Sequence, residues 1–158
     1  MKNMKKLVLV SAIVATSMSG SDFSVKVGYD NIKFGDISDS GASISMISSK
    51  SNKGFAFELG YINADKLAVT KFGMLYNWKI LNNFYTGLNL GVHGVNFQDN
   101  DSYNTSSFTG YTFGLQSKYE INKNNSIDLS YVQGSATDKS GIVSEDLSIA
   151  SIAYSYRF

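Results

Sequence analysis

The stretch LSIASIAYSYRF, from Leu147 to Phe158, decides the fold of this chain. One set of alternate residues becomes apolar and aromatic toward its end and comprises Ser148, Ala150, Ile152, Tyr154, Tyr156 and Phe158. The residues between them are smaller or more polar and include Ser151, Ser155 and Arg157. Because a strand sends successive side chains to opposite faces, this stretch predicts a β-strand with one apolar, aromatic face and one mostly polar face.

The same alternation recurs along the chain in seven further segments, each separated from the next by turn-forming residues. The segments lie at 23–30, 42–48, 55–62, 70–79, 87–93, 113–120 and 127–131, and the pattern is weakest at 42–48. No segment beyond the N-terminus keeps a helical period. The sequence therefore predicts an all-β domain of eight antiparallel strands, which could form a sandwich or a closed barrel.

The N-terminus has the three-part layout of a secretory signal peptide. Three lysines precede an apolar run at 7–15, and small residues follow that run. A run of about nine apolar residues is too short for a transmembrane helix, which needs roughly 20. We therefore expect a signal peptide at 1–21, cleaved after Ser19 or Ser21, and a mature domain at 22–158. The alternative is a short amphipathic helix at the start of a cytosolic protein.

The composition excludes several classes of function. Charged residues make up 17% of the chain, below the roughly 25% of soluble domains. The chain has no cysteine, which excludes a disulfide, a thiolate nucleophile and a thiolate metal site. No stripe of lysine and arginine appears, so nucleic-acid binding is not expected.

Two patterns favour a membrane barrel over a sandwich or a soluble barrel. First, the connections Ser49–Lys53, Asn82–Asn83 and Asn122–Asn125 are short, whereas Gly35–Gly41, Gln98–Ser107 and Gly134–Asp146 are longer. Short turns at one end and longer loops at the other are typical of transmembrane barrels, although the short connection Asn63–Lys66 departs from this layout. Second, charges avoid the apolar face, and the other face is mostly Gly, Ser and Asn, which suits a narrow interior better than a water-exposed surface.

Charge is also distributed unevenly between the two predicted ends. The longer connections carry the acids Asp36, Asp39, Asp65, Asp99, Asp101, Asp138, Glu145 and Asp146 against Lys66 and Lys139. The short turns and their edges carry Lys50, Lys53, Lys79 and Lys123 and no acid. We expect a molecule that is electrically polarised along its axis. Aromatic girdles are also expected, with Phe55, Trp78, Phe84, Tyr119, Tyr156 and Phe158 at the short-turn end and Tyr29, Tyr61 and Tyr131 at the other.

The chain resembles the small eight-stranded bacterial outer-membrane β-barrels, the class of the OmpA transmembrane domain, OmpX and the opacity proteins. The terminal Phe158, preceded by Ile152, Tyr154 and Tyr156 at alternate positions, is similar to the assembly signal of that class. The resemblance implies an eight-stranded up-and-down transmembrane barrel in the outer membrane. It also implies contact with lipid and lipopolysaccharide, and recognition of the last strand by the barrel-assembly machinery. The peptidoglycan-binding domain of full-length OmpA-type proteins does not follow here, so cell-wall tethering is not expected.

The inward face places several charges inside the predicted barrel. If the first strand starts at the short-turn end, Lys26, Glu58, Lys118, Glu120, Asp128 and Arg157 share that half of the lumen. Burial of charge is costly unless the charge is paired, so these residues should form an ion-pair network, with Arg157 directed toward Asp128 and Glu120. A gated pore or a catalytic cluster is the alternative. We favour a polar plug because an eight-stranded barrel is just wide enough for side chains to fill.

Two other features of the sequence suggest chemistry. His93, the sole histidine, faces inward, and outer-membrane acyl hydrolases and acyltransferases use a His and a Ser, but no Ser lies near it in sequence. The run Asp99–Ser102 begins like a calcium loop but lacks the glycine at position six and the glutamate at position twelve. These acidic loop residues could still share divalent cations with lipopolysaccharide.

The sequence thus favours a non-enzymatic outer-membrane surface barrel with no cofactor. Its role would be structural or an interaction made through the loops. The alternatives are a small-solute pore and an enzyme that modifies lipid A or phospholipid through His93.

Overall fold

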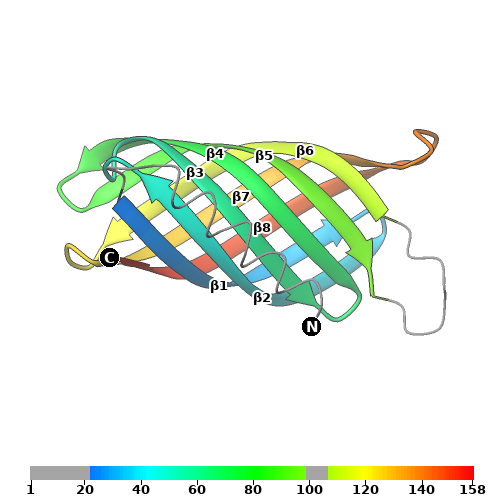
Figure 1. Ribbon diagram of the computed structural model, residues 1–158, viewed down its shortest axis with the longest axis horizontal. Helices are drawn as coiled ribbons and strands as arrows, with labels where there is room; N and C mark the ends of the chain where they lie inside the picture. Colours follow the sequence, from blue (N-terminus) through cyan, green and yellow to red (C-terminus); the bar gives the residue numbers. More distant parts are fainter. Residues whose placement is uncertain (1–21, 99–106) are drawn as a thin grey trace.

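The computed structural model describes residues 22–98 and 107–158, and these form eight β-strands (Figure 1). The strands are β1 (Asp22–Phe34), β2 (Ile37–Ser49), β3 (Gly54–Ala64), β4 (Leu67–Leu81), β5 (Phe84–Phe97), β6 (Ser107–Glu120), β7 (Asn125–Asp138) and β8 (Ser144–Arg157). Among these residues no helix is long and apolar enough to cross a membrane. The predicted signal peptide at 1–21 lies outside the described residues and stays a prediction.

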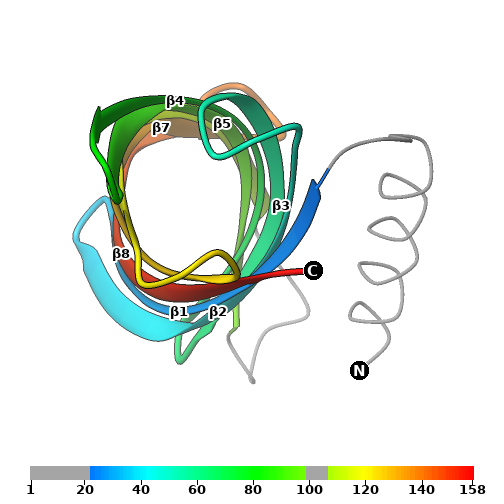
Figure 2. The ribbon, with the colours of Figure 1, turned by 90° about the vertical axis from the view of Figure 1, so that its left-hand side faces the viewer.

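Each strand pairs antiparallel with the next, and β8 pairs with β1, so the sheet closes on itself (Figure 2). The all-β class, the strand count and the up-and-down barrel are therefore confirmed. Stepping through directly paired residues from Ser24 around all eight strands returns to β1 at Phe34, a shear of ten residues. With this shear the strands tilt about 40° from the axis, and each residue along a strand rises about 2.5 Å.

The two ends of the barrel differ in what they carry. The terminal end holds the start of β1, the end of β8 and the connections 50–53, 82–83 and 121–124 (Figure 1). The backbone N–H of Phe158 donates to the carbonyl of Phe23 and ties the last residue to the first strand at this end. The distal end holds the connections 35–36, 65–66, 98–106 and 139–143.

The strands reach further toward the distal end than the sequence indicated. The second strand was expected at 42–48 but runs from Ile37 to Ser49, and the expected loop at 35–41 is a two-residue turn at Gly35 and Asp36. The expected loop at 134–146 is only 139–143, because β7 and β8 also extend toward the distal end. These residues are polar on the outward face, which made them look like loops, yet their backbones remain paired in the sheet.

An apolar belt surrounds the barrel. Its exposed side chains include Val27, Phe72, Leu90, Leu129 and Ile152. Between Ala150 and Phe158 on β8 the belt spans about 20 Å along the axis, close to the roughly 25 Å band of transmembrane barrels. The aromatics exposed toward the terminal end include Phe55, Trp78, Tyr119, Tyr156 and Phe158, and those toward the distal side include Tyr29, Tyr111 and Tyr131. The predicted Phe84 and Tyr61 are half-buried.

The interior is divided into two compartments along the axis. The distal half holds an apolar compartment of buried side chains: Ile32, Phe34, Ile62, Ala64, Leu67, Val69, Val95, Phe108, Val132, Ala136, Leu147 and Ile149. Phe34 contacts Phe108 edge-on, with ring centroids 5.0 Å apart. The expectation of a polar interior throughout is therefore wrong for the distal half.

The polarity of the sheet reverses along single strands. On β1, Val27 and Tyr29 face outward and are exposed, whereas Ile32 and Phe34 face inward and are fully buried or nearly so. Above this reversal the outward face carries polar residues such as Asn31 and Lys33. The terminal half is therefore apolar outside, and the distal half is apolar inside like a water-soluble barrel.

A carboxylate ties two distal turns together. Asp39 on β2 accepts the backbone N–H groups of Lys66, at 2.7 Å, and Leu67, at 3.0 Å. Partial burial raises the pKa of Asp39, but the backbone donors Lys66, Ser40 and Leu67 outweigh it and hold the pKa below its ordinary value. The ionised form therefore stabilises the distal end at neutral pH.

Replacing Leu90 by Arg tests the position of the belt. Leu90 lies mid-belt and is 49% exposed, so in lipid the change should cost roughly 2–4 kcal/mol of unfolding free energy. The control Asn96→Arg lies on the same strand and face but distal to the belt, and should stay within about 0.5 kcal/mol. Urea unfolding in liposomes measures both, and equal costs would contradict the assigned belt.

Candidate functional site

The lumen of the terminal half holds a balanced set of charges. Among its buried and half-buried inward residues, four cations lie against four anions: Lys26, Lys71, Lys118 and Arg157 against Asp30, Glu58, Glu120 and Asp128. Each lies in the phase opposite to the exposed apolar belt, so alternation along the strands is what brings all eight into one compartment.

Glu58 is the centre of the larger charge cluster. Its Oε1 lies 2.8 Å from the Nζ of Lys26 and 3.1 Å from the Nζ of Lys71, and the Glu58 side chain is 2% exposed. Glu58 lies on β3, Lys71 on the adjacent strand β4 and Lys26 on β1, so the two lysines approach the carboxylate from strands on either side of β3. One carboxylate between two ammonium groups is a compact arrangement that locks three strands in one register.

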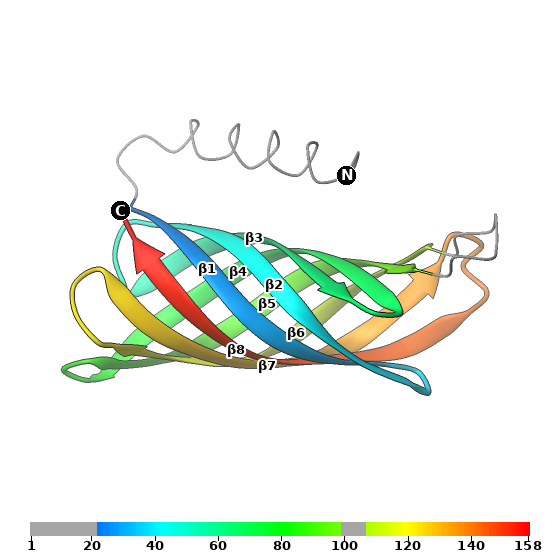
Figure 3. The same cartoon turned by 90° about the horizontal axis from the view of Figure 1, so that it is seen from below.

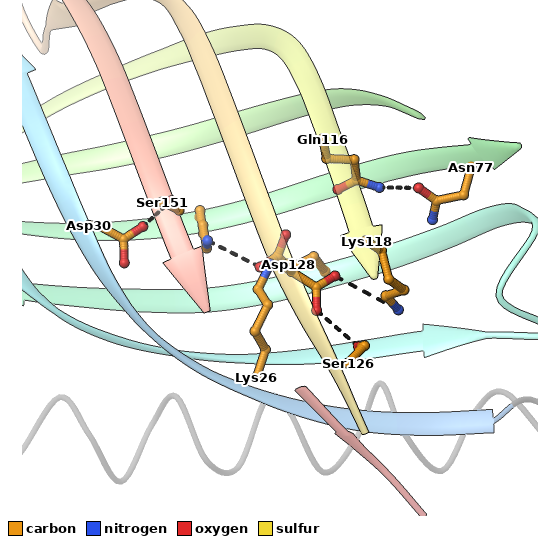
Figure 4. Close-up of polar contacts among 10 residues, drawn as sticks. Lys26, Asp30, Asn77, Gln116, Lys118, Ser126, Asp128 and Ser151 are labelled. Carbon is orange, nitrogen blue, oxygen red and sulfur yellow. Dashed lines mark hydrogen bonds and ion pairs between the residues drawn. The ribbon is translucent and has the colours of Figure 1, made fainter. Parts of the chain in front are cut away.

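A second group lies nearer the terminal end. Asp128 lies 3.9 Å from the Nζ of Lys118 and accepts a hydrogen bond from Ser126, and Figure 4 shows both contacts as dashed lines from Asp128. The amide of Gln116 donates to the side chain of Asn77 (Figure 4). These contacts join β6 to β7 and reach across the lumen to β4.

Two further contacts involve the remaining carboxylates, although Oδ2 of Asp30 is buried without a hydrogen-bond partner. Asp30 accepts a hydrogen bond from Ser151 on β8 (Figure 4). Glu120 accepts one from the Tyr85 hydroxyl at 3.1 Å. Together with the ion pairs, these contacts spread polar bonding over β1, β3, β4, β5, β6, β7 and β8.

The predicted network forms in part. Lys26–Glu58 and Lys118–Asp128 are ion pairs, as expected for partners in one lumen. Arg157 was expected to pair with Asp128 and Glu120, but the ion pairs of the described residues do not include it. Asp128 pairs with Lys118, and Glu120 accepts a hydrogen bond from Tyr85. The backbone N–H of Arg157 donates to the carbonyl of Asn124, and its side-chain Nε is buried without a hydrogen-bond partner.

Lys71 was missing from the predicted network. It faces inward like the others, but it lies near the middle of β4, away from the end where the other charges were expected. Its long, flexible stem lets the ammonium reach Glu58 on the adjacent strand. The sequence did contain a sign of this: in the alternation of the 70–79 segment, Lys71 falls in the inward set.

His93 faces inward, as predicted, and is 3% exposed. Its Nδ1 lies 3.1 Å from the Thr112 hydroxyl on β6. The ion pairs of the described residues do not include His93, so no carboxylate is seen to orient the imidazole as a catalytic triad requires. This hydroxyl–imidazole pair lies inside the wall, so a lipid substrate in the membrane would have to cross the sheet to reach it.

The acidic run Asp99–Ser102 lies outside the described residues, so its role in cation binding stays a prediction. Within the part of the chain that the structure describes, no three His, Asp or Glu side chains are grouped to hold a metal ion.

The C-terminal strand presents its alternate residues outward. Ile152, Tyr154, Tyr156 and Phe158 are all exposed on the exterior, as the sequence indicated. The Tyr156 and Phe158 rings contact edge-on at 5.1 Å, and Phe158 lies 6.2 Å from Phe23 across the β1–β8 seam. The outward side chains are therefore positioned on the closing strand where a recognising surface could reach them.

Solved structures with the same architecture are small outer-membrane barrels. The attachment invasion locus protein Ail of Yersinia pestis is 14% identical with a TM-score of 0.58, and the match covers 87% of this chain and 99% of Ail. The N-terminal β-barrel domain of Pseudomonas aeruginosa OprF is 15% identical with a TM-score of 0.63, covering 87% and 99%. The chain has the fold of the small outer-membrane β-barrels.

Neisserial surface protein A has this small outer-membrane barrel fold too, at 14% identity and a TM-score of 0.61, with 89% of this chain and 98% of that one covered. No model of a protein family matches the sequence, and no curated protein matches it. At these identities the likeness shows the fold alone.

Within this barrel fold, the charge cluster around Glu58 predicts a distinctive stability pattern. Glu58→Leu leaves two buried ammonium groups unpaired and should cost about 3–5 kcal/mol of unfolding free energy. Combining it with Lys26→Met and Lys71→Met removes all three charges and should restore most of that loss. Urea unfolding in detergent micelles compares them, and a triple variant weaker than Glu58→Leu would contradict the pairing.

Proposed function

We propose that this protein is a closed, non-enzymatic barrel of the bacterial outer membrane that carries its distal connections above the membrane for contact with other molecules. The observation that carries this proposal is the reversal of polarity along the strands. A barrel that only crossed a membrane would need no apolar core beyond its apolar belt. Here the sheet continues past the belt with a polar exterior and a packed apolar interior.

The distal half supports the presentation of a surface. From Tyr29 to Phe34 the first strand rises about 12 Å beyond the last exposed aromatic of the belt. The two-residue turn at Gly35 and Asp36 is fixed to β8 by a hydrogen bond from the Gly35 N–H to the Asp146 carbonyl. Asp39 fixes the next turn in the same way. Such a support presents its connections in a defined geometry, which lowers the entropy cost of binding.

The distal connections and the strand residues next to them carry more acidic than basic residues, and Asp65 and Asp138 are among the acids. We also propose that divalent cations could bridge these carboxylates to the phosphates of lipopolysaccharide. In the cell, the outward residues of β8 would be recognised by the barrel-assembly machinery before closure.

A solute pore is less well supported than a surface role. The terminal compartment is crossed by ion pairs and the distal compartment by apolar side chains. The shear of ten sets a backbone radius of about 8 Å, which side chains of this size fill. An enzymatic role is weaker still because His93 lies buried beside Thr112.

Labelling of single cysteines tests the location and orientation. The chain contains no cysteine, so Ile142→Cys, at a position 84% exposed in the 139–143 connection, introduces a unique thiol. In intact Gram-negative cells, a membrane-impermeant thiol reagent should label Ile142→Cys. The control Asn82→Cys, in a terminal-end turn, should react only after the outer membrane is permeabilised. Labelling of both or of Asn82→Cys alone in intact cells would overturn the proposed orientation.

Conductance in planar bilayers separates the surface barrel from a pore. The protein should give no steady channel, and Glu58→Gln should give none either, because the distal apolar compartment closes the lumen independently of the charges. A steady conductance from the unaltered protein would favour the pore.

A further inference from the structure

The exterior is hollowed by a groove on one side of the barrel, over β1, β6, β7 and β8. Two hollows of about 500 Å³ and about 720 Å³ adjoin there and share Tyr131 in their linings. Figure 3 shows β1, β8 and β7 side by side on this side of the barrel.

Small side chains on β8 form the floor of the groove. The outward residues Ala150 and Ser148 lie directly beside larger neighbours on both adjacent strands. Ala150 pairs with Asn31 and Tyr131, and Ser148 with Lys33 and Gln133. The groove therefore runs along β8 between the larger side chains of β1 and β7.

The part of the groove nearer the terminal end is apolar. Its lining includes Tyr29, Leu115, Leu129, Ile152 and Ala150, and these residues lie in the apolar belt. In the membrane proposed above, this part of the groove faces the lipid hydrocarbon. An acyl chain is the ligand whose chemistry fits it.

The distal part of the groove is charged and lies beyond the belt. Its lining includes Lys33, Asp36, Glu145 and Asp146. No ion pair of residues 22–98 and 107–158 uses any of these four side chains. One ammonium group next to several carboxylates complements a headgroup that carries both a negative and a positive charge.

We propose that this groove, lined by Ala150 and Tyr131 within the belt and by Lys33 and Asp146 beyond it, binds one zwitterionic phospholipid whose headgroup carries a primary ammonium. The acyl chain lies along Ala150, the phosphate contacts Lys33, and the ammonium donates to Asp146 and Asp36. From Ile152 to Asp146 the strand climbs about 15 Å, enough to place chain and headgroup in their two parts of the groove.

The charge balance distinguishes this ligand from other lipids. An anionic lipid would meet three carboxylates with one lysine and would be repelled. A quaternary ammonium has no N–H to donate to a carboxylate, so it would lose the hydrogen bonds that a primary ammonium makes. This inference rests on the proposed membrane position of the belt, but its test does not depend on the location of the protein in cells.

Native mass spectrometry of the detergent-folded, delipidated protein tests the proposal. Phosphatidylethanolamine, phosphatidylcholine, phosphatidylglycerol and lipopolysaccharide with Mg²⁺ are each added at equal concentration. One phosphatidylethanolamine should remain bound, with affinity at least about tenfold above the other three. Equal binding of all lipids, or preference for phosphatidylglycerol or lipopolysaccharide, would overturn the proposed headgroup.

Variants locate the site. Ala150→Phe fills the floor of the groove and should reduce binding at least about tenfold. The control Ala42→Phe adds the same ring at an exposed position on β2, outside the groove, and should bind normally. Asp146→Asn should lower the preference for phosphatidylethanolamine over phosphatidylcholine, and Lys33→Gln should weaken binding of both. Normal binding by Ala150→Phe would place the lipid elsewhere and overturn the groove.

The folded state of each variant is checked by its gel shift between unboiled and boiled samples. If the protein folds in detergent and labels at Ile142→Cys in cells but shows no selective lipid binding, the groove proposal fails while the surface-barrel proposal stands. If the protein does not fold in detergent at all, the proposed membrane position of the belt fails first.

Discussion

Closure of eight strands with a shear of ten residues is the constraint on which the rest of this molecule depends. A hydrocarbon environment offers no hydrogen-bond partner, so a sheet within it must leave no open edge. The pairing of β1 with β8 removes the last edge. The same closure sets a narrow radius, and a narrow lumen must be filled by the side chains that face it.

The lumen is filled differently in its two halves because the exterior differs. Where the exterior is apolar, the inward side chains are mostly polar, apart from the buried cluster of Ile47, Ala56 and Leu75. The buried charges there are stabilised by pairing, as in Lys26, Lys71 and Glu58. Where the exterior turns polar, the barrel needs the hydrophobic effect to hold it together, and the inside becomes apolar. The change of side between Tyr29 and Ile32 on β1 marks the transition.

The groove on β8 follows from the same geometry. A closed barrel is convex, so a depression on its outside arises where small residues such as Ser148 and Ala150 lie between larger neighbours on β1 and β7. The groove crosses the distal border of the belt, so its apolar part and its charged part follow each other along β8. Selective lipid binding would add a local function to a wall that otherwise has a structural role.

Much of the fold could be read from the sequence, because the two-residue period of a strand is local and survives in every segment. The tail from Leu147 to Phe158 showed which side chains face outward, and the count of similar segments showed how many strands close the barrel. The distal extensions of β2 and β7 were missed, because their outward residues are polar and did not match the apolar alternation found elsewhere.

The sequence by itself determined the alternating faces, the number of strands and the residues that could meet in the lumen. The tertiary structure alone decided that Glu58 bridges Lys26 and Lys71, that Lys118 rather than Arg157 takes Asp128, and that a groove opens on β8. The physical reason is that the face of the sheet to which a side chain points depends only on its position along its own strand. Pairing depends instead on the stagger of strands around the closed ring, and no single segment of the sequence encodes that stagger.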